Sequence, residues 1–281
     1  MQKAILWSRA HRGIVLTLLA LGSLVFMTPF YLMLVMSLKS KTEVGTTSIW
    51  AWPKAPSLHN YEVVLTNPNV NFTLLFKNTL VIGVVSTLGV VLTASLVAYA
   101  FARMQFRGRD RLFLVLLSTM MLPAIVTMIP SYVLYRQLGW INTALPLTVP
   151  AFFGGGAFNI FLLRQYYMGI PRELDEAALL DGASHWTVYW RILLPLSGPA
   201  LATVAIFHFV FSWRDFLGPL MVLNDPDRMT LEVGLSAYNS LRATEWELIM
   251  AGSVLVSLPL VILFFIGQRY FVKGIVMSGL K

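Results

Sequence analysis

The residue types that most often carry out catalysis are scarce and scattered in this sequence. There is no cysteine, so disulfides, thiolate metal sites and a cysteine nucleophile are excluded. No HExxH or similar ligand spacing occurs, and the nearest approach to a GxxxxGK(S/T) phosphate loop, Gly274 to Gly279, is followed by Leu280. We therefore predict no catalytic residue, no metal site and no bound cofactor in this chain. The four histidines lie far apart: His11, His59, His185 and His208.

Two groups of charged side chains remain as candidates for function. One is the pair Arg214–Asp215, which lies near the end of an otherwise apolar stretch. An ionisable pair at membrane depth marks a functional site by default, although these two residues can equally pair with each other near an interface. The other is a set of three carboxylates, Glu173, Asp175 and Glu176, which suits the positive end of a helix dipole.

The elements that position these residues are predicted to lie in a membrane. The 281 residues are 57% hydrophobic and only 12% charged, whereas soluble domains carry about 25% charged residues. One soluble core of this size cannot hold so much apolar material, so a bilayer is the natural solvent. The net charge of +8 then indicates basic flanks on cytoplasmic loops rather than a nucleic-acid partner.

Six apolar stretches are long enough to span a bilayer, which takes about 20 residues. With a cytoplasmic N-terminus, thirteen of the 21 Lys and Arg residues fall on the inner side, and every inner loop agrees. The prediction is an all-α membrane protein with six transmembrane helices and both termini in the cytoplasm. The predicted spans are Ile14–Met36, Leu80–Ala102, Leu112–Leu134, Ala144–Leu163, Pro199–Leu223 and Leu248–Gln268.

The predicted organisation is a cytoplasmic N-terminus (1–13), a six-helix transmembrane domain (14–268) with an inner loop (164–198), and a cytoplasmic tail (269–281). The first apolar run is longer than that of a signal peptide, so we expect a span there. Proline and glycine inside the spans are interpreted as ordinary kinks and sites of close packing. Residues 39–78 are expected to form a packed cap near the membrane interface, with Trp50, Trp52 and Tyr61. Residues 224–227 are expected to form a turn, in a loop that either contacts an external partner or only connects two helices.

Between Pro171 and Pro195 the pattern predicts two short helices joined at a glycine. Pro171 suits a first helical turn, Gly182 stands where a left-handed helix end is expected, and Ser184 can cap the second helix. Such a stiff unit can transmit force from a partner or lie passively at the membrane interface, and the pattern alone leaves both open. The first helix has a small apolar face, and the second has an aromatic stripe that would rest on the interface or on span ends. These residues are Leu174, Ala177 and Ala178, then Trp186, Tyr189, Trp190 and Leu193.

This loop resembles the cytoplasmic loop of ABC-importer permeases, whose pattern is EAA-x3-G-x9-I-x-L-P. Resemblance to carbohydrate-type permeases continues over nearly the whole chain from the first span on, for example at residues 98–103, 121–123, 213–216 and 268–271. It is closest to the shorter, second permease of maltose systems. One departure is Arg214, where the family more often has Asn, and this leaves the substrate open. The loop residues that match are Glu176, Ala177, Ala178, Gly182, Ile192, Leu194 and Pro195.

The resemblance implies a type I ABC importer permease fold in the cytoplasmic membrane of a bacterium or archaeon. It also implies a second, different permease, an extracytoplasmic sugar-binding protein, and two ATPase subunits that bind ATP and Mg and dock on residues 171–195. The chain would be the non-enzymatic subunit that translocates a sugar, with a di- or oligosaccharide expected. By the same resemblance the Glu176 helix would sit in a cleft of the ATPase, and Gly182 would give the bend.

Sugars need hydrogen-bonding groups and aromatic faces, which suggests a substrate path through the fourth and fifth spans. Glycerol phosphate or another polar solute is the alternative cargo. An ion-coupled secondary transporter is disfavoured, because only one charged pair and no evident repeat are found. A membrane enzyme lacks a convergent catalytic set, and a pure assembly protein is disfavoured by the loop pattern. The candidate path residues are Phe158, Asn159, Trp213, Arg214, Asp215 and Phe216.

Overall fold

The computed structural model describes residues 2–68, 70–236 and 245–278, and these residues contain helices but no strand. Four helical segments are long and apolar enough to cross a membrane, and two bent helix pairs pass the same test together. The predicted helical membrane architecture is confirmed in this coarse form, with up to six spans if each bent pair counts as one. The four segments are His11–Ser37, Phe72–Arg103, Leu145–Met168 and Trp246–Gln268.

The chain divides into two compact units, and the first comprises residues 1–69 and 237–257. Within it, the ammonium group of Lys39 is buried and donates to the Ser48 carbonyl at 2.8 Å. The Asn60 amide donates to the carbonyls of Ser37 and Lys39 at 2.8 and 2.7 Å. Buried polar groups thus hold together the segment that follows the first long helix. Its helices are α1 (Gln2–Ser37), α2 (Lys41–Thr46), α3 (His59–Thr66) and the start of α15 (Trp246–Ser278).

The expected aromatic cap is only partly present in this unit. The Tyr61 hydroxyl lies 2.6 Å from the hydroxyl of Ser37, so Tyr61 does join the packed segment. Trp50 and Trp52 are both exposed, however, so they do not close a core. Exposed tryptophans with a polar ring nitrogen suit the interfacial region of a bilayer.

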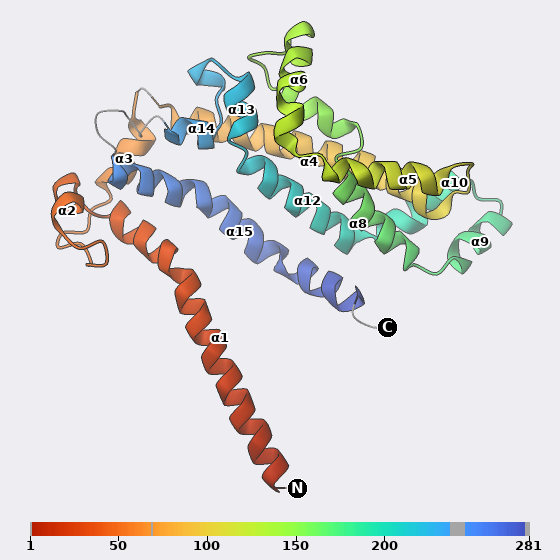
Figure 1. Cartoon of the computed structure of the whole chain (residues 1–281), viewed down its shortest axis with the longest axis horizontal. Coiled ribbons are helices and arrows are strands. Elements are labelled where there is room, and N and C mark those ends of the chain that lie inside the picture. The colour runs from red at the N-terminus through yellow and green to blue at the C-terminus, as the bar shows by residue number, and fades with distance from the viewer. Residues whose placement is uncertain (1, 69, 237–244, 279–281) are drawn as a thin grey trace. The chain divides into compact units, whose positions relative to one another are not determined.

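The second unit, residues 70–236 and 258–281, is organised around the long helix α4 (Phe72–Arg103). Helices α8 (Ala157–Met168) and α12 (Gly198–Trp213) pack along it, and Ala94 and Ala98 in their shared core are fully buried. Small residues let helix backbones approach closely, which is the usual basis of helix association in membranes. Helices α9 (Glu173–Leu180) and α10 (His185–Val188) lie at the C-terminal end of α4 (Figure 1).

The remaining elements of this unit are short, and most connect the long helices. Helix α13 (Leu217–Val222) and helix α14 (Leu231–Leu235) lie toward the N-terminal end of α4 (Figure 1). The others are α5 (Arg109–Ser118), η1 (Thr119–Met121), α6 (Ala124–Gln137), α7 (Leu145–Thr148), η2 (Val149–Phe152), the π-helical turn η3 (Tyr189–Leu193), α11 (Leu194–Leu196) and η4 (Pro226–Arg228).

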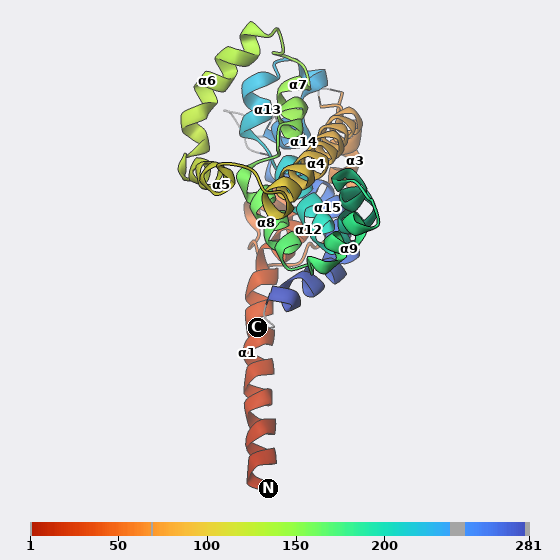
Figure 2. The same ribbon diagram turned by 90° about the vertical axis from the view of Figure 1, so that its right-hand side faces the viewer.

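The expected span over residues 112–134 consists of two helices that meet at an angle. The segments Arg109–Met121 and Ala124–Gln137 meet at 97°, and Figure 2 shows α6 turned away from the direction of α5. The cause is local: Pro123 forces Leu122 into an extended conformation with ψ of 117°, which ends the helix. A second bend of 76° separates His185–Leu196 from Gly198–Trp213.

The expected span over residues 144–163 is also interrupted, at three successive glycines. Gly154, Gly155 and Gly156 all have positive φ, with values of 94°, 62° and 89°. At Gly155 a Cβ atom would lie 2.6 Å from a methyl group of Val90 on α4, so only glycine permits this approach. The expected close packing is confirmed at Gly155, but the three glycines form a tight turn against α4 rather than an ordinary kink.

Candidate functional site

The hairpin of residues 171–195 has the two helices that its sequence predicts. Helix α9 begins at Glu173, two residues after Pro171, and its first turn carries the three carboxylates. Gly182 has a φ of 82°, its N–H donates to the Leu179 carbonyl at 3.0 Å, and the next N–H bonds back to Ala178 at 2.9 Å. This pair of bonds is the Schellman arrangement that ends helices at glycine.

The second helix starts as expected, but its aromatic stripe is divided. The Ser184 hydroxyl accepts a hydrogen bond from the Thr187 N–H at 3.2 Å, which confirms the predicted cap. Tyr189 and Leu193 are buried in the core, whereas Trp186 and Trp190 are exposed. The stripe was expected to rest on the membrane interface or on span ends, and only its Tyr189 and Leu193 pack against the core around α4. The π-helical turn from Tyr189 to Leu193 changes the helical period, so an i, i+3, i+4, i+7 pattern no longer marks a single face.

Helix α9 is held at one side and exposed at the other. Ala178 packs against the core of the second unit, but α9 contains no buried residue. Glu176 and Ala177 are exposed, and the side chain of Leu180 is 89% exposed. An exposed leucine beside small and acidic residues gives a surface that a partner can cover. The other motif residues lie further along the hairpin: Ile192 and Leu194 are partly buried and Pro195 is exposed in α11.

A buried ion pair joins α9 to the last turn of α4. The Arg103 Nε lies 3.3 Å from an oxygen of Asp175, and their side chains are only 4% and 13% exposed. Arg103 also donates through Nη2 to the Ile170 carbonyl at 2.7 Å. Breaking a buried pair by removing one partner typically costs about 3–5 kcal/mol. The pair therefore fixes the start of α9 on α4.

Two hydroxyl contacts join the second half of the hairpin to the same helix. The Tyr99 hydroxyl donates to the His185 carbonyl at 2.9 Å. The hydroxyls of Ser95 and Tyr189 lie 2.7 Å apart, and the two tyrosine rings are 5.3 Å apart. Together with the ion pair, these contacts place three anchors on successive turns of one face of α4, at residues 95, 99 and 103.

These anchors were missed from the sequence. The sequence shows Arg103 as a basic residue at the end of a span and as part of the 98–103 resemblance. Its pairing with Asp175 was not predicted. The available signal was its spacing of four residues from Tyr99, which puts both polar groups on one helix face.

Burial raises the pKa of the Asp175 carboxyl above its ordinary value, although Arg103 and Arg172 oppose this effect. The cost of burying the Asp175 carboxylate therefore offsets part of the stability that its attraction to Arg103 contributes.

Three of the predicted substrate-path residues line cavities: Phe158, Asn159 and Asp215. Phe158 and Asn159 line a cavity of about 1140 Å³, together with Phe207, His208 and Phe211. Asp215 lines another cavity of about 500 Å³, to which His208 and Phe211 also contribute. Both cavities are bordered mainly by apolar and aromatic side chains, with a few polar groups among them, as is common for small-molecule sites.

The other predicted path residues do not line either cavity. Trp213 is fully buried and packs on the rings of Phe76 and Phe209, at 5.6 and 5.4 Å between centroids. Arg214 and Phe216 are exposed, and no ion pair joins Arg214 to Asp215 in the part of the chain that the structure describes. The Asp215 carboxylate instead accepts a hydrogen bond from the Gly218 N–H at 3.0 Å. His208 and Phe211 were not predicted as path residues.

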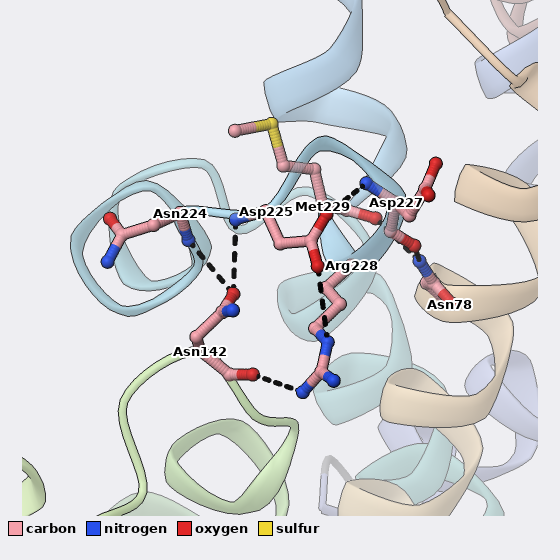
Figure 3. Close-up of polar contacts among 7 residues, drawn as sticks. All are labelled: Asn78, Asn142, Asn224, Asp225, Asp227, Arg228 and Met229. Atoms are coloured by element: carbon pink, nitrogen blue, oxygen red, sulfur yellow. Dashed lines mark hydrogen bonds and ion pairs between the residues drawn. The ribbon is translucent and has the colours of Figure 1, made fainter.

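At the N-terminal end of α4 a polar clasp joins three segments that are distant in the sequence (Figure 3). The Asn142 carboxamide oxygen accepts from the N–H groups of Asn224 and Asp225 at 3.2 and 3.1 Å, and its carbonyl accepts from Arg228 at 2.6 Å. The Asn78 amide of α4 donates to the carbonyls at 227 and 229. Asp225 accepts from the N–H of residue 227, so the predicted turn at 224–227 is confirmed.

Comparison with known proteins assigns the chain to a family. Residues 90–277 match the family described as "Binding-protein-dependent transport system inner membrane component". The arabinooligosaccharides transport system permease protein AraQ of Halalkalibacterium halodurans is 35% identical over 256 residues, covering 90% of each chain. The trehalose/maltose transport system permease protein MalG of Thermococcus litoralis is 32% identical over 263 residues, covering 93% of this chain and 94% of that protein.

A solved structure agrees with this assignment. It belongs to a bacterial ABC transporter involved in the import of the acidic polysaccharide alginate, with a TM-score of 0.80 and 25% identity. The match covers 94% of this chain and 97% of that one. The chain belongs to the family of binding-protein-dependent transport system inner membrane components, the permease subunits of ABC transporters. Such a subunit is not itself catalytic.

Proposed function

We propose that this chain is a permease subunit that translocates a di- or oligosaccharide across the cytoplasmic membrane, driven by ATP hydrolysis on partner subunits. The observation that supports the proposal most directly is that α9 is anchored on one side and exposed on the other. This helix is anchored at one side to α4 through Arg103 and Asp175, while its other side is exposed. A helix that is firmly joined to a long span and open to a partner can pass movement from one to the other. The relatives named for arabinooligosaccharides and for trehalose and maltose support the choice of a sugar.

In the proposed arrangement the C-terminal end of α4 and both chain termini face the cytoplasm. There α9 docks on an ATPase subunit, with Glu176 paired to a basic residue of that subunit. ATP and Mg bind to the two ATPase subunits, and a second, different permease completes the complex. The polar clasp lies at the opposite end of α4 and stiffens the surface that an extracytoplasmic sugar-binding protein would contact.

The proposed substrate path runs along the cavity that Phe158 and Asn159 line. The exposed ring of Phe158 offers a face for a sugar ring, and His208 and Asn159 provide polar groups at the cavity wall. Asp215 lines the neighbouring cavity and extends the polar lining. Trp213 supports the path from within the core, because its ring is buried against Phe209. Few polar groups suit a transporter that must release its cargo.

The proposal is tested by uptake of labelled maltose and arabinooligosaccharides by the chain reconstituted with its partner subunits. Glu176→Lys places a like charge against the expected basic partner, so uptake should be lost while membrane insertion stays normal. Glu62→Lys, an exposed reversal on α3, is the matched control and should transport normally. Normal uptake with Glu176→Lys would show that the docking assignment is wrong. Uptake of glycerol phosphate but of no sugar would contradict the proposed cargo.

A further inference from the structure

A basic hollow lies beside the anchor of α9 and is not used by the proposed transport mechanism. It has a volume of about 770 Å³ and is lined by the turn between α4 and α5 together with Arg172, which directly precedes α9. Four arginines and one aspartate face it, and most of the remaining lining is polar or glycine. The lining residues are Gln105, Phe106, Arg107, Gly108, Arg109, Asp110, Arg111 and Arg172.

The charge in this hollow is strongly positive and only partly compensated. Asp110 is paired with Arg109, whose Nε lies 3.0 Å from its carboxylate. Arg107 and Arg111 are exposed and take part in no ion pair among the described residues. The hollow therefore has more positive than negative side chains. Phosphate groups are well matched to several arginines at once, because each guanidinium offers a fork of donors.

The start of α5 adds to this positive field. Gly108 stands at the N-cap position with a φ of 84°, and no side chain caps the helix there. The first N–H groups of a helix and its dipole favour an anion. The helix dipole and the arginines therefore act on the same space.

The surface next to the hollow is apolar and exposed. Leu112, Leu114 and Val115 of α5 are each more than half exposed, and Phe106 lies in the hollow itself. A free phosphate has no apolar part that could contact this surface, whereas the acyl chains of a phospholipid can lie along it. Basic pockets beside membrane helices on the cytoplasmic side are suited to anionic lipid headgroups.

We infer that this hollow binds the phosphate headgroup of an anionic phospholipid, with the acyl chains lying along α5. The inference rests on the proposed arrangement in the membrane, in which this end of α4 is at the cytoplasmic surface. Since Arg172 precedes α9 by one residue, the bound lipid would contact the element that docks on the ATPase.

The test is lipid binding to the purified full-length chain, measured by native mass spectrometry during titration with phosphatidylglycerol or phosphatidylcholine. The double variant Arg107→Gln/Arg111→Gln removes two charges from the hollow. Each basic residue near an anionic lipid contributes about fivefold, so phosphatidylglycerol should bind about 25-fold more weakly. Phosphatidylcholine binding should not change. The control Lys54→Gln/Arg136→Gln removes the same charge from exposed positions elsewhere and should bind phosphatidylglycerol like the unmodified chain.

Three results would overturn the inference. The first is equal phosphatidylglycerol affinity in the hollow variant and the control. The second is displacement of the lipid by inorganic phosphate at a similar concentration, which would identify a free-anion site. The third is a hollow variant that keeps the lipid but no longer captures an ATPase subunit, which would identify a protein contact. Because the lipid measurement needs neither ATPase nor sugar, a failure of the proposed transport function would leave its result unaffected.

Discussion

The ion pair between Arg103 and Asp175 gives the sharpest prediction, because its parts can be removed separately and together. We consider the variants Arg103→Met, Asp175→Leu and the double variant. Each single change leaves one buried charge without its partner, at side chains that are 4% and 13% exposed. The double change leaves an apolar pair of similar volume in the same place.

The expected magnitudes follow from the surroundings of the pair. A stranded buried charge costs about 3–5 kcal/mol, and we expect about 3 kcal/mol for Arg103→Met because Arg172 also acts on Asp175. That cost lowers the ratio of α9 packed on α4 to α9 detached from α4 by more than about 100-fold. The two hydroxyl contacts at residues 95 and 99 contribute only about 1 kcal/mol each and cannot replace the pair.

The double variant should recover most of this loss. Burial raises the pKa of Asp175 despite its basic neighbours, so desolvation of the carboxylate outweighs their attraction. In that situation an apolar replacement of the whole pair is commonly neutral or stabilising. We therefore expect the double variant to lie within about 1 kcal/mol of the unmodified chain.

The assay is a double-mutant cycle on the reconstituted complex, with thermal stability and sugar transported per ATP hydrolysed as readouts. Both single variants should lower both readouts, and the double variant should restore both. A double variant no better than the worse single variant would refute the reasoning, because each residue would then act through a separate contact. Unchanged transport in both single variants would also refute it.

Three further predictions concern the hairpin, the glycine turn and the energy source. Gly182→Val forces a branched side chain into a φ of 82°, so uptake should be abolished while the protein still inserts, as measured by transport and membrane fractionation. Gly155→Ala should lower stability by about 2–4 kcal/mol in a thermal melt, because its Cβ would meet Val90 at 2.6 Å. Gly139→Ala is the matched control, because its φ of 70° is close to the 62° of Gly155 and no atom lies within 4 Å of its Cβ position; it should cost only about 1 kcal/mol, and equal losses would contradict this account. The purified chain alone should hydrolyse no ATP, and robust hydrolysis in a phosphate-release assay would contradict the proposed division of labour.

Local features of the hairpin could be predicted from the sequence because they depend on neighbouring residues. The end of α9 at Gly182 and the cap at Ser184 both follow from side chains within a few positions. The turn at residues 224–227 is of the same kind. The π-helical turn at 189–193 is different, because no residue type or spacing in the sequence marks it. A pattern that assumes one helical period cannot show it.

Contacts between distant segments could not be predicted from a single sequence. Arg103 and Asp175 are separated by two predicted spans and the loops around them, and no local pattern links them. The same holds for Asn142, whose oxygen meets N–H groups at 224 and 225. Trp213 was placed on the substrate path because sugars need aromatic faces, but its ring is buried in the packed core. The bend at Pro123 had a visible cause, yet the apolar run on both sides suggested one continuous span.

The central claim is that α9 is the surface on which the ATPase subunit docks. The chain has no cysteine, so Leu180→Cys provides one unique thiol at an exposed position of α9. Leu220→Cys provides a matched exposed thiol on α13, toward the other end of α4. In the assembled complex, a short thiol-reactive photo-cross-linker should join Leu180→Cys to the ATPase subunit and should not join Leu220→Cys to it. Cross-linking to the ATPase from residue 220 but not from residue 180 would contradict the claim.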